Sequence, residues 1–353
     1  MNSKEFLQSK LKKDEAFLII SEANRRYITG FDSSDGYLFI SKKRTAFLTD
    51  SRYIEAAENK AKNCDEILLL KKASDELPEV AEKLNINKIF TEGDGISVSE
   101  LEFLKKIFPF EVVPDKADKF INDLRRTKSE EEKNKIIAAQ RIAEGAFEHI
   151  LGFIKPGVTE KEIRTELDYY MIKNGADNPS FDTIAISGKN TSMPHGVPTD
   201  KKIENGDFVT MDYGALLEGY HSDMTRTVAV GFVNDKQADI YNIVLKAQMA
   251  TLDILKAGVS CKAADAAARN IINAAGYKDN FGHGTGHGVG LFIHELPNLS
   301  PRSKLILRQG DIVTDEPGIY IPGQFGVRIE DMVFITENGC ENLTKCKKSL
   351  IVL

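Results

Sequence analysis

The sequence predicts a mixed α/β protein with two domains, the second of which consists of two similar halves. Short apolar runs alternate with helical patterns through about residue 118, which is typical of a separate α/β domain. A charged segment without a long apolar run, residues 116–133, follows this alternation. Later in the chain, two stretches about a hundred residues apart resemble each other, a period too long for a solenoid repeat.

The first domain is expected to contain at least four strands and three helices. Short apolar runs predict strands at residues 16–21, 37–41, 46–49 and 66–70. Amphipathic spacing predicts helices at residues 53–62, 73–84 and 98–107. Residues 24–31 and 49–53 are expected to be polar turns after strands, either ordinary strand ends or functional loops.

The second domain is expected to begin with a helix. Ser129 can cap its start, and Glu132 stands three residues later, where it completes a capping box. The residues that follow at helical spacing are apolar: Ile136, Ala139, Ala143, Phe147 and Ile150. The boundary is therefore placed just before this helix, near Asp123, which divides the chain into residues 1–122 and 123–353.

One part of the internal repeat is a helix. Residues 153–176 align with residues 254–277 without a gap. Thr159 and Ser260 then occupy the same N-cap position, and a glycine stands at the C-terminal end of each stretch. Each stretch therefore predicts one helix of the same length.

The repeat continues into residues with functional side chains. His195 in the first copy stands where His294 stands in the second. Further on, GDFVTMDYG at residues 206–214 aligns with GDIVTDEPG at residues 310–318. Each copy therefore has an apolar strand at the same place after its helix and histidine.

Each copy of the repeat also carries two carboxylates. Asp212 aligns with Glu316, and Asp223 in HSDMTRT falls near Glu330 in VRIEDM. Taken singly, each has a structural alternative, since the aspartates suit turns and Glu330 could pair with Arg328. The shared order of helix, histidine and two carboxylates nevertheless predicts two α/β halves that face each other across a pseudo-two-fold axis.

If the halves face each other, four carboxylates meet in one pocket, where they cannot all stay ionised unless cations neutralise them. A glycine-rich segment without Lys or Arg, FGHGTGHGVGLFIHELP at residues 281–297, adds His287 as a nitrogen ligand. This ligand set suits two divalent ions about 3.5–4 Å apart that activate a shared water. Oxygen-rich ligands favour Mn, Co, Fe or Zn. His283 has no evident partner and is expected to be structural.

The composition argues against several other classes of protein. The 353 residues carry a formal net charge of −6, whereas a nucleic-acid-binding protein needs a basic face. No apolar run approaches the length of a membrane span, and the first residues are polar rather than signal-like. The four cysteines form no CxxC pair and are expected to be free thiols. We therefore expect a soluble protein of a reducing compartment.

Four motifs resemble those of the "pita-bread" metallopeptidases, which include methionine aminopeptidase, aminopeptidase P and prolidase. They are SFDTIAISGKNTSMPHG, MDYGALLEGYHSDMTRT, GHGTGHGVGLFIHELP and TDEPGIYIPGQFGVRIED, within residues 123–353. TGFDSSDGYLFI and LTDSRYIEAA also resemble the front domain of the proline-specific branch. The resemblance implies an N-terminal creatinase-like α/β domain before a pseudo-two-fold pita-bread catalytic domain, and it favours functional loops in the front domain.

The resemblance implies a role for each ligand. Asp212 would chelate one metal ion, Asp223 and Glu330 would bridge both ions, and His287 and Glu316 would hold the other. Mn or Co is expected first, with Zn or Fe as alternatives. A water or hydroxide that bridges the ions would attack the scissile carbonyl, because coordination lowers the pKa of the water.

The resemblance also implies residues that act on the substrate. Glu316 would serve as the proton shuttle, His294 would stabilise the tetrahedral oxyanion, and His195 would contact the substrate beyond the scissile bond. Arg328 would orient Glu330 or line the pocket.

Two positions depart from the family pattern. Asp315 stands where an aliphatic residue usually precedes the metal-binding glutamate, and its alignment with Met211 places it on the core side of the strand. A carboxylate there needs a partner or a raised pKa. Asn298 stands where many prolidases carry an arginine that can hold the substrate carboxylate; Arg302 is close in sequence and is the candidate replacement.

The expected function is a cytoplasmic, homodimeric, dinuclear-metal exopeptidase that hydrolyses Xaa-Pro bonds in peptides with proline at the second position, in dipeptides, or in both. An Xaa-Pro bond has no N–H to grip, so a pocket shaped for the ring would recognise it. Alternatives are a strict Xaa-Pro dipeptidase, a non-catalytic binding module on the same fold, and a metal-free creatinase-like amidinohydrolase. Retention of all five ligands argues against the last two.

Overall fold

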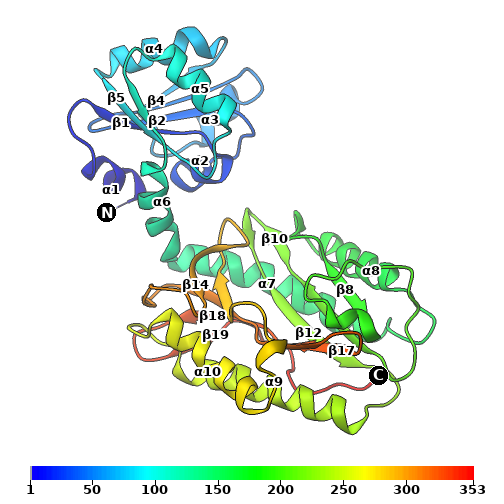
Figure 1. Ribbon diagram of the computed structural model, residues 1–353. Coiled ribbons are helices and arrows are strands. Elements are labelled where there is room, and N and C mark those ends of the chain that lie inside the picture. The colour runs from blue at the N-terminus through cyan, green and yellow to red at the C-terminus, as the bar shows by residue number, and fades with distance from the viewer. Residues whose placement is uncertain (1) are drawn as a thin grey trace. The chain divides into compact units, whose positions relative to one another are not determined.

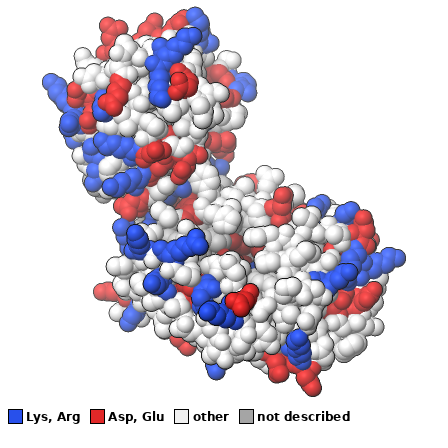
Figure 2. Space-filling view, viewed as in Figure 1, with Lys and Arg blue, Asp and Glu red and all other residues white. Residues whose placement is uncertain are grey.

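The computed structural model describes residues 2–353 and divides into two compact units, Met1–Arg125 and Arg126–Leu353. The sequence analysis placed this boundary near Asp123. No helix within residues 2–353 is long and apolar enough to cross a membrane. On the face drawn in Figure 2, Lys and Arg side chains are interspersed with Asp and Glu over both units.

The first unit is a six-stranded sheet between two layers of helices. The strand order is β4-β3-β2-β1-β5-β6, and β2 alone runs antiparallel to its neighbours. The strands are β1 (Glu15–Ile19), β2 (Tyr37–Ser41), β3 (Thr45–Thr49), β4 (Glu66–Leu69), β5 (Lys88–Thr91) and β6 (Glu111–Val113). The helices are α1 (Ser3–Ser9), α2 (Glu22–Thr29), α3 (Ile54–Lys60), α4 (Ala73–Lys83), α5 (Val98–Ile107) and α6 (Lys116–Arg126).

Strand β1 is buried on both faces, which is why its sequence is continuously apolar. Phe17 and Ile19 pack with residues of α1, α2, α3 and α6. Ala16 and Leu18 point to the other face and pack with residues of α4 and α5. The four strands and three helices expected here are confirmed within one to two residues at each end.

The prediction of a polar turn at residues 24–31 was wrong. The chain forms helix α2 there, because its polar side chains are buried against partners that are distant in sequence. Asn24 donates from Nδ2 to Oε1 of Glu92 at 2.7 Å, and Arg25 donates from Nη2 to the Ser33 carbonyl at 2.6 Å. A polar sequence that buries its side chains in this way has no apolar stripe to reveal the helix.

The second unit combines two helix pairs with several small sheets, whose arrangement Figure 1 shows from green to red. The helices are α7 (Glu130–Leu151), α8 (Glu160–Lys173), α9 (Asp235–Ile254) and α10 (Cys261–Ala274), with 3-10 turns η1 (Gly188–Ser192) and η2 (Lys278–Asn280). The main sheets have the orders β12-β9-β8 and β14-β13-β15-β18-β19, and two smaller ones have the orders β11-β10-β7 and β16-β17.

The strands of this unit are mostly antiparallel and short. Those of the first half are β7 (Asn178–Pro179), β8 (Ile184–Ser187), β9 (Phe208–Tyr213), β10 (Ala215–Leu217), β11 (Tyr220–His221) and β12 (Met224–Ala229). Those of the second half are β13 (Gly286–Gly288), β14 (Glu295–Leu299), β15 (Ile312–Asp315), β16 (Gly318–Ile321), β17 (Phe325–Arg328), β18 (Asp331–Ile335) and β19 (Cys340–Asn342).

The helices of the repeat form as predicted. Helices α8 and α10 each contain 14 residues, and the side chains of Thr159 and Ser260 accept N-cap hydrogen bonds. Gly175 and Gly276 follow these helices with φ of +104° and +91°, a conformation that glycine adopts without steric cost. The Ser129 capping box with Glu132 at the start of α7 is also confirmed.

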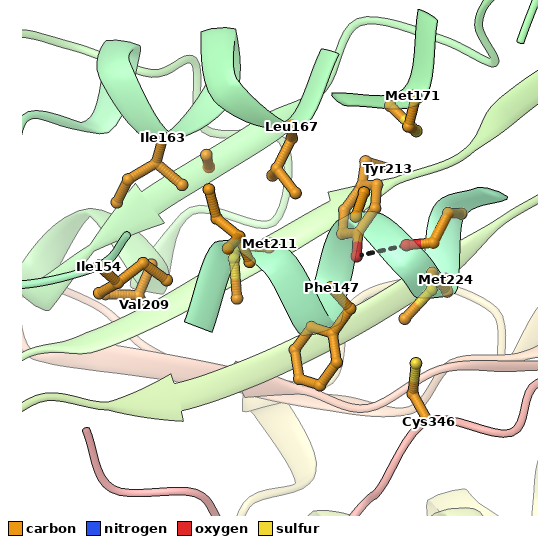
Figure 3. Packing of buried hydrophobic residues seen from close by; sticks show 14 of the residues in the cluster. Phe147, Ile154, Ile163, Leu167, Met171, Val209, Met211, Tyr213, Met224 and Cys346 are labelled. Carbon is orange, nitrogen blue, oxygen red and sulfur yellow. Dashed lines mark hydrogen bonds between the residues drawn. The ribbon is translucent and has the colours of Figure 1, made fainter. Parts of the chain in front are cut away.

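The largest hydrophobic core of the second unit packs against one face of strand β9. Figure 3 shows side chains of α7 and α8, among them Phe147 and Leu167, packed against Met211 and Tyr213 of β9. The Tyr213 hydroxyl donates to a backbone carbonyl of α7 at 3.1 Å. Because side chains alternate across a strand, Asp212 between these two core residues points to the opposite face. The packing of Met211 and Tyr213 in the core therefore directs the Asp212 side chain away from it.

Candidate metal centre

The four predicted carboxylates and all four histidines singled out from the sequence line one cavity of about 430 Å³ in the second unit. Its wall comprises Phe181, Ile184, Pro194, His195, Asp212, Asp223, His283, Gly284, Gly286, His287, Ile293, His294, Asn298, Ser300, Glu316, Arg328 and Glu330. Among the described residues, Arg302 is the one predicted site residue that does not line this cavity. It is exposed.

Paired strands deliver the carboxylates in the same way in both halves. Asp212 lies in β9, and Asp223 immediately precedes β12, the antiparallel partner of β9. Glu316 immediately follows β15, and Glu330 immediately precedes β18, the antiparallel partner of β15. Each strand pair therefore presents its two carboxylates at one end, as the repeat predicted.

A group of potential ligand atoms lies at the centre of the cavity. One side-chain atom each from Asp223, His287 and Glu330 lies within 4.8 Å of the others. Nε2 of His287 is 3.5 Å from Oδ2 of Asp223 and 3.6 Å from Oε1 of Glu316. Side chains from strands β13, β15, β18 and β12 thus meet at one point.

Burial and mutual repulsion raise the pKa values of three of these carboxyl groups. Burial, followed by the charges of Asp212 and Glu316, raises the pKa of Asp223 well above its ordinary value. Burial and then the Asp223 charge raise the pKa of Glu330 in the same way. Burial also raises the pKa of Glu316, to about 8. These groups resist ionising together unless positive charge is supplied.

Histidine 287 has the complementary property. Burial, with a smaller contribution from the nearby His294, lowers the pKa of His287 to about 4. Its imidazole is therefore neutral at physiological pH, which is the form that binds metal ions. Its Nδ1 lies 3.1 Å from the Gly288 carbonyl, an arrangement that leaves Nε2 facing the carboxylates.

These residues fit divalent cations on an observation that does not depend on any relative. Oδ1 of Asp212 and Oδ1 of Asp223 are buried and have no hydrogen-bond partner among residues 2–353. Buried carboxylate oxygens without partners are costly, and a coordinated cation satisfies them. Two such oxygens beside a neutral imidazole make a suitable ligand set for a hard or borderline divalent ion.

Arg328 is a positively charged side chain that lies beside these carboxylates. Its Nη2 donates to Oδ2 of Asp212 at 2.5 Å, and its Nη1 donates to the Tyr320 hydroxyl at 2.8 Å. Its Nε donates at 3.0 Å to Oγ1 of Thr225, which in turn donates to Oε2 of Glu330 at 2.7 Å. Arg328 therefore lines the cavity, contacts Asp212 directly and reaches Glu330 only through a threonine.

The two other histidines with expected roles flank the ligand group. His294 and His195 are exposed side chains on the cavity wall. The rings of His287 and His294 are 4.4 Å apart at their centroids and inclined at 65°. His294 is therefore within reach of a substrate group that lies beside the His287 ligand position.

His283 and Tyr320 were not recognised as part of this site from the sequence. His283 lines the cavity, and its Nε2 lies 2.8 Å from the Tyr320 hydroxyl that Arg328 also contacts. Burial lowers the pKa of His283 to about 4. The available signal was the tyrosine itself, since its polar tip stands in the otherwise apolar run GIYI of β16.

Comparison with known proteins identifies the family. Residues 134–337 match the model of metallopeptidase family M24, and residues 7–127 match the creatinase/prolidase N-terminal domain. The chain belongs to the M24 metallopeptidases. This confirms the creatinase-like first domain and the pita-bread catalytic domain predicted from the motifs, and it identifies the chain as an enzyme that depends on divalent metal ions.

Relatives with solved structures cover nearly the whole chain. An Xaa-Pro dipeptidase from Bacillus anthracis is 44% identical with a TM-score of 0.96 and covers 99% of each chain. An X-Pro aminopeptidase from Thermotoga maritima is 37% identical with a TM-score of 0.91 and covers 98% of this chain and 99% of its own. An Xaa-Pro dipeptidase from Pyrococcus horikoshii is 40% identical over 339 residues, 96% of this chain and 94% of its own.

Proposed function

We propose that this metallopeptidase is an exopeptidase that hydrolyses the Xaa-Pro bond of peptides with proline at the second position and of dipeptides. The observation that carries the proposal is the ligand set in the cavity, where two partnerless aspartate oxygens meet a neutral histidine and two further carboxyl groups. Relatives of similar length named for action on Xaa-Pro bonds supply the substrate class.

The five ligands have distinct expected positions around two metal ions. Asp212, Asp223, His287, Glu316 and Glu330 would together hold the two ions. Divalent ions bound here supply Lewis-acid polarisation of the scissile carbonyl and lower the pKa of a water. Arg328 fixes the orientation of one oxygen of the Asp212 ligand through the 2.5 Å contact.

Three side chains handle the proton and the developing charge. Glu316 lines the cavity beside His287 and is placed to accept a proton from the attacking water and return it to the leaving nitrogen. His294 donates to the oxyanion that develops on the scissile carbonyl. His195, on the opposite loop of the cavity wall, contacts the peptide beyond the scissile bond.

An apolar wall provides a place for the proline ring. Phe181, Ile184 and Ile293 line the cavity together with the polar residues. The nitrogen of an Xaa-Pro bond carries no hydrogen, so recognition depends on burying the ring rather than on gripping an N–H.

The charge of the cavity favours longer peptides over strict dipeptide specificity. Among the described residues of the cavity wall, Arg328 is the one Lys or Arg, and Asp212 and Tyr320 already occupy its guanidinium group. Asn298 lines the cavity where a cation would hold the carboxylate of a dipeptide. A strict Xaa-Pro dipeptidase is the second candidate, because two of the similar proteins carry that name.

The metal, the location and the assembly belong to the same proposal. Carboxylate-rich ligands support Mn or Co, with Zn or Fe as alternatives. Four free cysteines, two of them buried, support the reducing environment of the cytoplasm. We expect a homodimer without nucleic-acid or membrane partners.

The test is hydrolysis by metal-stripped protein with and without added Mn or Co, on Ala-Pro, Ala-Pro-Ala and Ala-Ala-Ala. We expect metal-dependent cleavage of both proline peptides and none of the third. Cleavage of Ala-Pro alone would establish the strict dipeptidase. Asn298→Arg is the matched variant, and it is expected to raise the rate on Ala-Pro relative to Ala-Pro-Ala by about tenfold. Failure to cleave any proline peptide would overturn the proposal.

A further inference from the structure

A buried ion pair lies behind the loop that carries His294. Nζ of Lys128 is 3.1 Å from Oε2 of Glu295, and the two side chains are only 1% and 2% exposed. The partners are 167 residues apart in sequence. Two charges removed from water must be closely paired, and removal of one partner leaves the other uncompensated.

The Lys128 side of the pair is anchored by the backbone. The Lys128 N–H donates to the Gly310 carbonyl at 2.9 Å, and Thr127 forms a β-bridge with Asp311. Arg126 pairs with Asp311 at 2.7 Å in a second buried ion pair. The two backbone contacts hold the segment that carries the Lys128 ammonium group on the catalytic unit, and the Arg126 pair adds stability beside them.

The Glu295 side of the pair closes a tight turn. Its Oε1 accepts the Phe292 N–H at 3.1 Å. A Cβ on Gly290 would lie 2.6 Å from Oε2, so a side chain at position 290 would displace the carboxylate from the turn. The Gly290 carbonyl also accepts the His221 N–H at 2.9 Å. The turn from Gly290 to Phe292 is thus folded around the Glu295 carboxylate.

This turn leads directly to the catalytic wall. His294 immediately precedes Glu295, whose backbone is paired in register with Gly288, the residue after the His287 ligand. His294 consequently lies between the turn and β14, the strand that pairs with β13, which carries the proposed ligand His287. A shift of the Glu295 carboxylate changes the distance from the His294 ring to the substrate carbonyl, and catalysis is sensitive to displacements of about 1 Å.

We propose that Lys128 is a positioning residue that holds Glu295, and through it the 290–294 turn, so that His294 points into the cavity. The inference rests on the proposed role of His294 in the reaction. Neither member of the pair touches the substrate position, because Lys128 and Glu295 are outside the cavity wall formed by the described residues. The pair therefore acts on catalysis through the turn and the strand residues that it holds, of which His294 is the one that faces the substrate.

The first test compares Lys128→Met with Arg126→Met, which removes a cation of similar burial from the neighbouring pair. Steady-state rates are measured with saturating Mn on Ala-Pro-Ala, together with bound metal and thermal unfolding. Lys128→Met is expected to lower kcat at least tenfold with bound metal unchanged and KM changed less than threefold. Arg126→Met is expected to lower the Tm while kcat stays within twofold of wild type.

Conservative and neutralising variants guard against a folding defect. Lys128→Arg keeps the charge and is expected to restore most of kcat. Adding Glu295→Gln to Lys128→Met removes the buried negative charge while keeping an acceptor for the Phe292 N–H, and it is expected to recover Tm and part of kcat. Equal loss of kcat in Lys128→Met and Arg126→Met, or no loss in either, would overturn the inference.

A readout independent of turnover separates this inference from the proposed function. Histidine side-chain NMR signals are recorded for wild type, Lys128→Met and Arg126→Met, with His294→Ala used to assign the His294 signal. Lys128→Met is expected to shift the His294 signal, and Arg126→Met is expected to leave it in place. Lack of Xaa-Pro cleavage by wild type would refute the function alone, whereas an unmoved His294 signal in Lys128→Met would refute the positioning role.

Discussion

The two halves of the catalytic unit use the same construction for the metal ligands but differ in the residue that supports one of them. In the first half, Met211 precedes the ligand Asp212 within β9 and is fully buried in the core. In the second half, Asp315 precedes the ligand Glu316 at the end of β15 and is also fully buried. A thioether on one side therefore corresponds to a carboxyl group on the other.

The surroundings of Asp315 are unusual for a buried acid. Neither of its oxygens makes a hydrogen bond of good geometry in the described part of the chain, although the nearby Thr251 side chain acts to lower its pKa. It stands directly opposite Asp331 in the β15–β18 pair, and burial followed by the charge of Asp331 raises the pKa of Asp315 well above its ordinary value. Asp331 is itself paired with Arg226 at 2.8 Å and Lys348 at 2.8 Å.

The difference shows which positions of the repeat are constrained by chemistry. The proposed ligand positions carry carboxylates in both halves, whereas the position before them carries a thioether in one half and a carboxyl group in the other. Two cations pair with Asp331, the neighbour of Asp315 across the strand pair, and the burial of Asp315 raises its pKa and is expected to cost stability. Metal binding by Glu316 and the stability cost of burying Asp315 are therefore expected to be separable by mutation.

The largest expected effect comes from removing one ligand from each half. Asp223→Ala and Glu330→Ala are each expected to lower kcat/KM by at least about a hundredfold and to reduce bound metal, since each supplies oxygens to the same centre. Asp200→Ala removes an exposed carboxylate of the same unit and is the control. Activity of either ligand variant in metal-free buffer would contradict a two-metal mechanism.

Exchanging the supporting residues is expected to have opposite effects in the two halves. Met211→Asp buries a charge without a partner and is expected to destabilise the protein by about 3–5 kcal/mol. Asp315→Val removes two unsatisfied oxygens and is expected to stabilise it by about 1–3 kcal/mol. Urea unfolding of the metal-free protein measures both.

A matched control distinguishes an unsatisfied acid from a satisfied one. Asp311 is as buried as Asp315 but accepts hydrogen bonds from Arg126. Asp311→Val is therefore expected to destabilise the protein, because it leaves the arginine unpaired. If Asp315→Val were as destabilising as Asp311→Val, the carboxyl group of Asp315 would have a partner that the structure does not reveal.

The metal-free protein is expected to lose stability as pH rises. The pKa of Glu316 is raised from 4.5 to about 8 in the folded state, so its contribution is fully present below pH 4.5 and is lost as pH rises through about 8. Asp223 and Glu330 are shifted in the same direction. Below about pH 6.5 the buried His283 and His287, whose pKa values are lowered to about 4, act in the opposite direction. The Tm of stripped protein should therefore fall between about pH 6.5 and 8, and saturating Mn should reverse the trend. A Tm that rises over this range without metal would contradict the shared-carboxylate site.

Much of the fold could be predicted because its signals are local. The strand at residues 37–41 and the helix at residues 98–107 have the predicted limits, since periodicity and caps lie within each segment. The convergence of the four carboxylates followed from the repeat, which states a spatial relation within the sequence itself. The residues of the proposed metal site were therefore easier to predict from the sequence than the residues of a pocket without such a repeat.

The parts that could not be predicted depend on distant partners. Helix α2 was missed because Asn24 is satisfied by Glu92 rather than by its neighbours. The attachment of Arg328 to Asp212 rather than to the nearby Glu330 is a choice between two carboxylates that only the packing of β17 decides. The Lys128–Glu295 pair could not be predicted either, because nothing in the sequence around either residue indicates that its side chain is buried.

The smallest predicted effect separates the N-caps of the two repeat helices. Thr159 belongs to a capping box in which Glu162 returns a hydrogen bond to the cap backbone, whereas Ser260 caps the N–H of Ala263, which has no side chain to return one. Both caps also take part in β-bridges, with Lys202 and Ile306. Apart from the exchange of threonine for serine, the reciprocal bond is the difference in capping between the two helices.

Ser260→Ala is expected to cost about 1 kcal/mol, and Thr159→Ala is expected to cost more because it disrupts both halves of the capping box. Ala263→Glu should give the second helix a capping box like that of the first by creating the missing reciprocal bond. It is expected to raise the Tm slightly. Thermal unfolding of the three variants measures the comparison. Equal losses from the two cap variants would mean that tertiary packing of the helices, which the two halves share, outweighs their capping chemistry.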